Sequence, residues 1–138
     1  MRKIMYFFIA VMILYFTSCK KENTPTKADN PAPKGTTLAT GTFVSNAHTS
    51  SGTVKVVQDS AGKISLVFEN FQTDNGPDLR IWLATNTSAT SYQEVGLLTA
   101  VSGNFSYPLN ASFNYTTNNN VLIWCKSFSV LFGHAVLQ

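Results

Sequence analysis

The sequence predicts an all-β fold: a single antiparallel β-sandwich or barrel-like domain of about eight short strands. Three observations lead to this prediction. Short runs of alternating apolar and polar residues recur along residues 37–138, turn-forming residues separate these runs, and no segment keeps a helical period over three turns. Because these residues number about a hundred, they match one ordinary domain with one core.

The chain begins with a segment that is typical of a signal peptide. Arg2 and Lys3 supply positive charge, and an almost unbroken apolar run follows from Ile4 to Phe16. At 1.5 Å per helical residue this run spans about 20 Å, against roughly 30 Å of bilayer hydrocarbon, so a permanent transmembrane helix is disfavoured. We therefore predict that residues 1–18 are a lipoprotein signal peptide.

The residues that end this segment resemble the lipobox of bacterial lipoproteins. In Phe16-Thr17-Ser18-Cys19 two small residues precede the cysteine, although Phe16 stands where leucine is commoner. The alternative is an ordinary cleaved signal with Cys19 as a spare thiol, which the small pair argues against. The resemblance implies lipidation of Cys19, a membrane anchor and a cell-envelope location. Lys20 replaces the Asp that retains many lipoproteins in the inner membrane, so the outer membrane is favoured over the inner.

Residues 19–36 are predicted to be the lipidated N-terminus and a flexible tether. From Lys20 to Thr36 the chain has no apolar residue larger than Pro or Ala, so it buries too little surface to order itself. Two of the ten Lys and Arg residues lie in the leader, which leaves eight against seven Asp and Glu. With this balance and no basic cluster among aromatics, nucleic acid is not an expected partner.

The strands of the folded part are predicted between turn signals. In residues 64–68 the side chains of Ile64, Leu66 and Phe68 share one face, as expected for a strand with one core face. Residues 59–62 predict a hairpin turn, and the strand that ends near Lys126 is apolar on both faces, which indicates a central position in its sheet. The predicted strands are residues 40–44, 52–58, 64–68, 79–84, 92–98, 104–109, 121–127 and 131–137.

Three segments differ from ordinary strand and turn sequence. They are Asp74-Asn75-Gly76-Pro77-Asp78-Leu79, Val121 to Lys126 with the Trp124-Cys125 pair, and Phe128 through Phe132-Gly133-His134-Ala135. Together with Gly41-Thr42-Phe43, His48 and Ser51-Gly52, their order resembles the DM-thirteen domain family, which is associated with electron transfer. The resemblance covers roughly residues 40–137.

The resemblance implies an all-β domain whose signature cysteine, Cys125 in this chain, is suspected of redox work as a bare thiol or as a ligand to a group such as haem. His48 and His134 lie within matching motifs and are the candidate ligands or thiolate partners. Two histidines and one cysteine are a thin ligand set, and no Cys-x-x-Cys-His sequence provides covalent haem attachment. No DOMON or membrane cytochrome segment is fused here, so the resemblance implies a separate redox partner protein.

The residues equally allow Cys125 to be structural. If the sulfur of Cys19 carries lipid, Cys125 is unpaired, and free cysteine is among the most buried residue types. Strand alternation sends Trp124 and Lys126 to the face opposite Cys125, so neither adjacent residue easily stabilises a thiolate. His134 can serve as a structural hydrogen-bonding group at a strand bend, and His48 as a solvated loop residue.

Other chemistries receive less support. Asp74 and Asp78 invite a calcium site, but their spacing fits no EF-hand loop and tight turns select the same residues, so calcium is disfavoured. Trp82 and Trp124 are expected to be core or sheet-face aromatics rather than a sugar platform. No nucleophile-elbow sequence or other constellation predicts an enzyme.

Three function hypotheses therefore stand. The first is a membrane-tethered lipoprotein that supports extracytoplasmic electron transfer or thiol redox chemistry through Cys125. The second is a non-catalytic binding or adhesion module in which Cys125 is a core residue. The third is a purely structural envelope lipoprotein.

Overall fold

A computed structural model describes residues 26–30 and 32–138, and these form ten β-strands. The expected signal peptide and Cys19 lie outside the described residues. None of the described residues belongs to a helix long and apolar enough to cross a membrane. In chain order the strands are β1 Thr26–Asp29, β2 Thr36–Thr42, β3 Val44–Ser45, β4 Ser50–Gln58, β5 Ile64–Thr73, β6 Leu79–Ala84, β7 Tyr92–Leu97, β8 Ala100–Leu109, β9 Asn120–Cys125 and β10 Val130–Val136.

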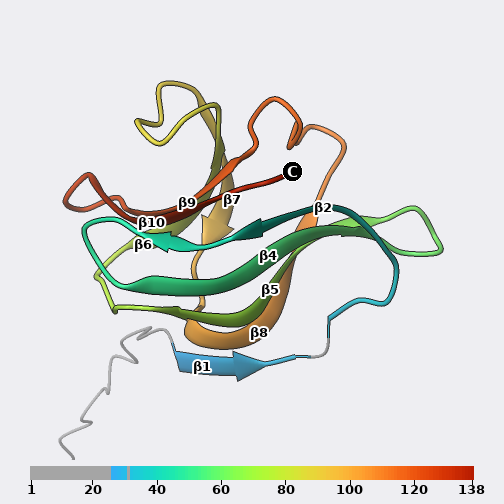
Figure 1. The fold of residues 1–138 in the computed structure, drawn as a ribbon, viewed down its shortest axis with the longest axis horizontal. Helices are drawn as coiled ribbons and strands as arrows, with labels where there is room; N and C mark the ends of the chain where they lie inside the picture. Colours follow the sequence, from blue (N-terminus) through green and yellow to red (C-terminus); the bar gives the residue numbers. More distant parts are fainter. Residues whose placement is uncertain (1–25, 31) are drawn as a thin grey trace, which may run out of the picture.

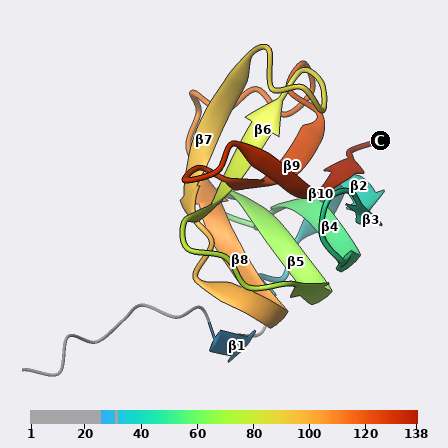
Figure 2. The ribbon, with the colours of Figure 1, turned by 90° about the vertical axis from the view of Figure 1, so that its left-hand side faces the viewer.

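The strands form two five-stranded sheets that pack face to face (Figure 1). The first sheet has the order β1-β8-β5-β4-β2 and the second the order β3-β10-β9-β6-β7. Figure 2 shows the second sheet as a layer above β8, β5 and β4. Backbone hydrogen bonds between Thr40 and Gln138 link the sheets along one edge without closing a barrel. The prediction of an all-β sandwich is thus confirmed.

Aromatic side chains fill much of the space between the sheets. The Phe68 ring stacks on Phe105 at a centroid distance of 4.8 Å and meets Phe71 edge-on at 5.3 Å. Phe43 joins from the β2–β3 junction and stacks on Phe68 at 5.7 Å. Burial of each such ring contributes roughly 1.5–3 kcal/mol, so this cluster is a main source of the fold's stability.

Most predicted strands lie where the alternation pattern put them. β6 has the predicted bounds, whereas β5 continues past Phe68 to Thr73 through a bulge at which Asn70 has a φ of 48°. The predicted central strand is confirmed as β9, because β10 and β6 flank it and Val121, Leu122 and Ile123 are fully buried.

The number of strands exceeds the prediction because two short edge strands carry little hydrophobic signal. β3 has two exposed residues, and β1 lies inside the segment 19–36 that was predicted to be a tether. β1 pairs in parallel with β8, the one parallel pair among the described strands, and Asn30 N–H donates to the Asn104 carbonyl at 2.8 Å. Such backbone bonds need no apolar side chains, so composition gave no signal for β1.

β1 can approach β8 closely because Gly103 has no side chain. A Cβ at Gly103 would lie 1.6 Å from the Ala28 carbonyl oxygen, and the φ of Gly103 is 110°, which other residues rarely adopt. An Asn104 side-chain N–H also donates to Asp29 at 3.1 Å. The edge of β8 is therefore shaped to accept this strand.

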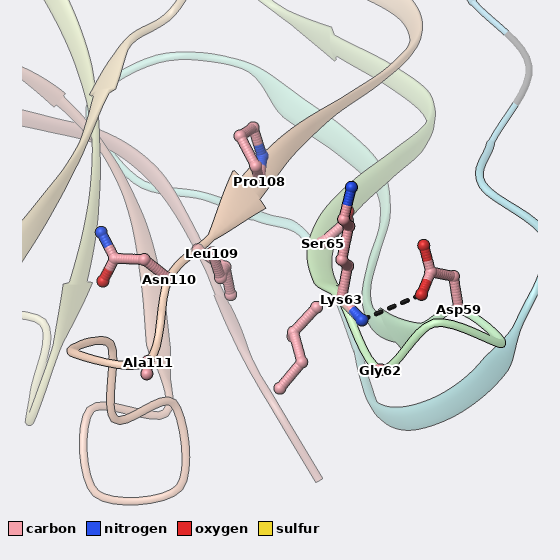
Figure 3. Close-up of a pocket in the computed structure, with 9 residues that line it drawn as sticks. Asp59, Gly62, Lys63, Ser65, Pro108, Leu109, Asn110 and Ala111 are labelled. Atoms are coloured by element: carbon pink, nitrogen blue, oxygen red, sulfur yellow. Dashed lines mark hydrogen bonds between the residues drawn. The ribbon is translucent and has the colours of Figure 1, made fainter.

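The β4–β5 hairpin closes one end of the sandwich with the predicted turn. Asp59 Oδ1 accepts from the N–H groups of Ala61 and Lys63, both at 2.9 Å, and Gly62 adopts a φ of 79°. A shallow pocket of about 410 Å³ lies between this turn and residues 108–111 at the C-terminal end of β8 (Figure 3). Its lining contains no histidine or cysteine. The motif residues gather at the Ser50 end of β4, and the pocket lies at the other end of that strand.

Candidate functional site

The motif residues that are scattered over the sequence meet at one end of the sandwich. Three loops converge there, residues 46–49 before β4, 74–78 before β6 and 126–129 between β9 and β10, and they lie together at the left in Figure 1. Strand register enforces this meeting, because Ser50 pairs with Thr73 and Cys125 pairs with both Leu79 and Val130.

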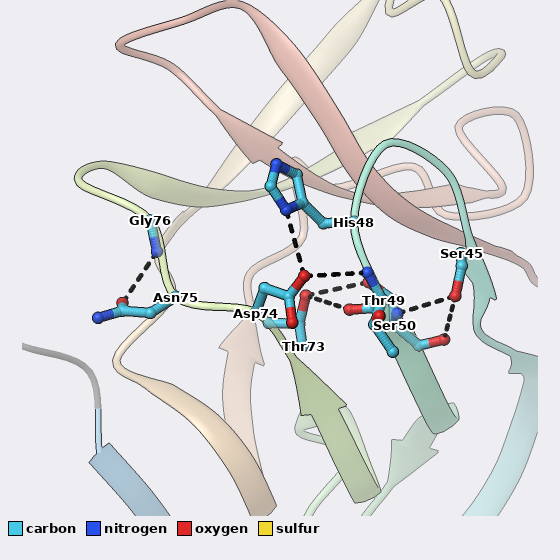
Figure 4. A network of polar contacts seen from close by, with 8 residues as sticks. All are labelled: Ser45, His48, Thr49, Ser50, Thr73, Asp74, Asn75 and Gly76. Carbon is cyan, nitrogen blue, oxygen red and sulfur yellow. Dashed lines mark hydrogen bonds and ion pairs between the residues drawn. The ribbon is translucent and has the colours of Figure 1, made fainter.

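His48 and Asp74 form the polar surface of this end (Figure 4). Asp74 Oδ2 contacts His48 Nδ1 at 3.2 Å and accepts from the Thr49 N–H at 3.2 Å. The other contact of the His48 ring is a stack on Phe132, with centroids 3.8 Å apart. His48 is therefore held in place by a carboxylate on one side and an aromatic ring on the other.

A buried hydroxyl pair supports this loop from below. Ser50 Oγ and Thr73 Oγ1 are 3.0 Å apart, and Thr73 Oγ1 also donates to the Thr49 carbonyl at 3.1 Å. Gly133 packs against Ser50, and a Cβ there would lie 2.3 Å from the Ser50 Cβ. The glycine of the Phe-Gly-His motif is thus required by close packing between β10 and β4.

The turn from Asp74 to Asp78 closes against the same strands. Gly76 lies against the Phe132 ring, since a Cβ there would be 3.0 Å from Phe132 Cζ. The Asp78 carbonyl accepts from the Lys126 N–H at 2.9 Å, and its carboxylate binds Arg80 Nε. The two carboxylates of the turn have different protein partners, and the described residues contain no cluster of three or more His, Cys, Asp or Glu arranged for a metal ion.

Cys125 lies at the centre of these elements but inside the core. It is 0% exposed and belongs to the same buried cluster as Leu79 and Phe132. The side chains of its chain neighbours lie on the opposite face of the sheet. Trp124 packs in a separate outer cluster, and Lys126 Nζ lies 3.9 Å from Glu94 Oε2. Phe132 is the link to the surface, since it shares the core with Cys125 and stacks on His48.

Comparison with known families identifies the domain. The family model described as electron transfer DM13 matches residues 42–137, which is most of the chain. The chain belongs to the DM13 family. No curated protein and no solved structure shows a significant match.

The DM13 match confirms the resemblance seen in the sequence. It begins at Thr42, at the end of β2, and ends at Leu137, just after β10, so it includes every motif at the Cys125 end of the sandwich. β1 and most of β2 lie outside it. The convergent loops therefore lie within the matched DM13 region, whereas the pairing of β1 with β8 involves a strand outside it.

The DM13 domain does not bring His134 to Cys125. A bulge between Leu131 and Gly133 inserts Phe132 into the core and moves His134 to the outer face, where it pairs with Leu122. His134 Nδ1 contacts Asn46 Oδ1 at 2.7 Å, so this histidine ties the 46–49 loop to β10.

The residues around Cys125 do not fit haem. A ligating sulfur needs an open side for the iron and the flat macrocycle, but Cys125 is enclosed by core side chains. His48 Nδ1 is held by Asp74 at the surface, and His134 is on the opposite side of the sheet. Haem is therefore not part of the function proposed below.

The β9–β10 hairpin tip presents one more motif aromatic. Phe128 is 71% exposed, and Ser129 beside it has a φ of 54°. Phe128 is the most exposed large hydrophobic side chain among the described residues.

Sequence reasoning missed a group on the outer face of the second sheet. There Glu94 accepts from Trp82 Nε1 at 3.1 Å and from Arg80 Nη1 at 3.0 Å, while Tyr92 stacks on Trp82. The alternation in residues 79–84 and 92–98 put these side chains on one face of each strand. Only the pairing register of β6 with β7 shows that they meet.

Proposed function

We propose that this chain is a lipoprotein, anchored in the cell envelope through Cys19, whose DM13 domain takes part in electron transfer through Cys125. The observation that carries the proposal is the convergence of the DM13 motif residues around Cys125. His48, Phe132 and the Asp74–Asp78 turn pack around the end of β9 that carries the cysteine. Family membership supplies the reaction class.

The burial of Cys125 favours electron transfer over thiol–disulfide exchange. Exchange requires direct contact between two sulfur atoms, which a fully buried side chain does not allow. Loss of one electron needs no such contact. In the proposed step a one-electron oxidant removes an electron from Cys125, the S–H proton leaves to solvent, and a reduced partner protein later returns the electron while the sulfur regains a proton.

The proposed anchor would hold the domain near the membrane. β1 begins at Thr26, so seven Cα–Cα steps separate it from Cys19, and a fully extended chain covers about 24 Å over that distance. Two or three acyl chains at Cys19 would make attachment nearly irreversible, at about 0.8 kcal/mol for each buried methylene. Electron partners are then membrane proteins or other anchored proteins. Cys19→Ala should release the chain from membranes in detergent-free fractionation.

The Cys125 proposal is tested on the full-length lipidated chain in detergent, in which Cys125 is the one remaining thiol. A photogenerated ruthenium(III) polypyridyl complex serves as the one-electron oxidant, with dioxygen present to convert a sulfur radical into stable oxyacids. Peptide mass spectrometry then locates the oxidised residue. Oxidation at Cys125 in the folded chain supports the proposal. A cysteine that is oxidised only after unfolding overturns it.

A second candidate function is supported by the exposure of Phe128. In a non-catalytic binding module Cys125 is a core residue and the β9–β10 tip contacts the partner. This candidate predicts that Phe128→Ser abolishes partner capture in crosslinking on intact cells while Cys125→Ala leaves it unchanged. The electron-transfer proposal predicts that Cys125→Ala removes oxidation while Phe128→Ser leaves a folded, oxidisable domain.

A further inference from the structure

Three aromatic rings stack in a row across the outer face of the second sheet. The Tyr92 and Trp82 centroids are 3.8 Å apart with an interplanar angle of 14°, and those of Trp82 and Trp124 are 4.9 Å apart at 19°. Trp82 and Trp124 are the two tryptophans of the whole chain. The rings come from the adjacent strands β7, β6 and β9, so strand register fixes their order.

The row runs from the surface to the residue beside Cys125. Tyr92 is 45% exposed, Trp82 is 5% exposed, and Trp124, which is partly buried, is peptide-bonded to Cys125. Trp82 has a ring on each side of it, because β6 lies between β7 and β9, and so it offers no free face to a sugar. The faces of Trp82 are instead in contact with Tyr92 and Trp124, the two rings between which an electron would move.

The middle ring has a proton acceptor. Trp82 Nε1 donates to Glu94 Oε2 at 3.1 Å, and Glu94 Oε1 accepts from Arg80 at 3.0 Å. The pKa of Arg80 is raised by its hydrogen bond to Asp78 and further by Glu94. The guanidinium therefore remains charged and holds the Glu94 carboxylate in position. An indole that loses an electron becomes strongly acidic at N–H, and Glu94 is placed to take that proton.

We propose that Tyr92, Trp82 and Trp124 form a one-electron relay between the protein surface and Cys125, with Glu94 as the proton acceptor for Trp82. The inference rests on the proposed electron-transfer function and names its route. A one-electron oxidant docks at Tyr92 and removes an electron from the stack; the Trp82 N–H proton moves to Glu94. The electron hole then passes to Trp124, and Trp82 regains its proton from Glu94. An electron from Cys125 fills the hole at Trp124, and the S–H proton of Cys125 passes to solvent water.

The relay is tested by flash photolysis of the full-length chain in detergent with the ruthenium(III) oxidant. Transient absorption follows the tryptophan radicals, whose protonated and deprotonated forms have different spectra, and mass spectrometry measures oxidation of Cys125. Trp82→Phe keeps a stacked ring that is much harder to oxidise. Tyr115→Phe is the matched control for Tyr92→Phe, since Tyr115 is partly buried and outside the stack. Near-ultraviolet circular dichroism and thermal unfolding establish that each variant is folded.

The relay predicts that Trp82→Phe and Tyr92→Phe lower the rate of Cys125 oxidation at least tenfold, whereas Tyr115→Phe leaves it unchanged. Glu94→Gln should keep the tryptophan radical in its protonated form for longer, an effect that a merely structural stack would not produce. If Trp82→Phe oxidises Cys125 as fast as the wild type, the relay is wrong and the role of Cys125 stands. If tryptophan radicals form in the wild type while Cys125 stays reduced, the proposed function fails and the relay has no terminus at this cysteine.

Discussion

Replacement of Cys125 by serine should destabilise the domain more than replacement by alanine, although serine is closer in shape to cysteine. Cys125 is 0% exposed and its cluster neighbours are apolar, with Leu79, Val130 and Phe132 around it. Alanine loses the contacts of one sulfur atom and leaves a small cavity, which costs about 1–2 kcal/mol. Serine leaves a similar gap and adds a hydroxyl group without a polar side-chain partner, which costs roughly 1–3 kcal/mol more.

The assay is thermal unfolding of the two variants and the wild type under reducing conditions. For a folded part of about a hundred residues, 1 kcal/mol corresponds to roughly 4–8 °C in Tm. We therefore expect Cys125→Ala to unfold about 4–16 °C below the wild type, and Cys125→Ser at least about 4 °C below Cys125→Ala. Alanine is accordingly the better replacement in every functional experiment on this residue, because loss of activity in the serine variant could reflect loss of the fold.

If Cys125→Ser is instead more stable than Cys125→Ala, the side chain of residue 125 does not lie in an apolar core. If Cys125→Ser is as stable as the wild type, a polar group or water must lie beside the side chain, and the core around β9 is not apolar there. Haem ligation by Cys125 would then no longer be excluded, because the sulfur would not be enclosed by apolar side chains.

Three further predictions concern the elements around this site. Gly133→Ala should cost about 1–3 kcal/mol by overpacking against Ser50, measured by urea unfolding; an unchanged midpoint would show that β10 and β4 are not in close contact. Asp74→Ala removes the acceptor for His48 and Thr49, so the amides of residues 46–49 should exchange hydrogen faster while the Tm falls by only a few degrees. Unaltered exchange would show that the Asp74 carboxylate does not hold this loop. Asn30→Pro removes the N–H that donates to Asn104, so trypsin should cut after Lys27 sooner with little change in global stability, and equal cleavage would mean that β1 is not held by this bond.

The strands were largely predictable because their signal is local. β6 has the predicted bounds since Leu79, Ile81 and Leu83 share one core face, a local pattern that does not depend on which strands pair with it. β1 was not predictable, because it is held by backbone bonds to the edge of β8 and by the missing side chain of Gly103, neither of which depends on its own composition. The strand pattern therefore predicted the central strands, β2 and β7, and missed the short edge strands β1 and β3.

The candidate site was predictable as a set of residues but not as an arrangement. Period-two alternation would put His134 on the same face as Phe132, and hence toward Cys125. The bulge at Phe132 reverses this and leaves Phe132 and Ala135 in the core with His134 outside. His48, which looked like a solvated loop residue, is the histidine that reaches the core side of the site, through its stack on Phe132. One inserted residue thus decides which histidine is near the cysteine.

The Trp-Cys pair at the end of β9 acquires a physical meaning from the position of that strand. In a central strand, consecutive side chains enter the two faces of the sheet, so Cys125 lies in the core while Trp124 joins the outer stack. A tryptophan two residues away would lie on the same face as the cysteine. The pair is the shortest covalent link across the sheet, and it joins a buried sulfur to a ring system that ends at the surface in Tyr92. Burial of the thiol, which argues against contact chemistry, is therefore compatible with electron exchange over the outer face.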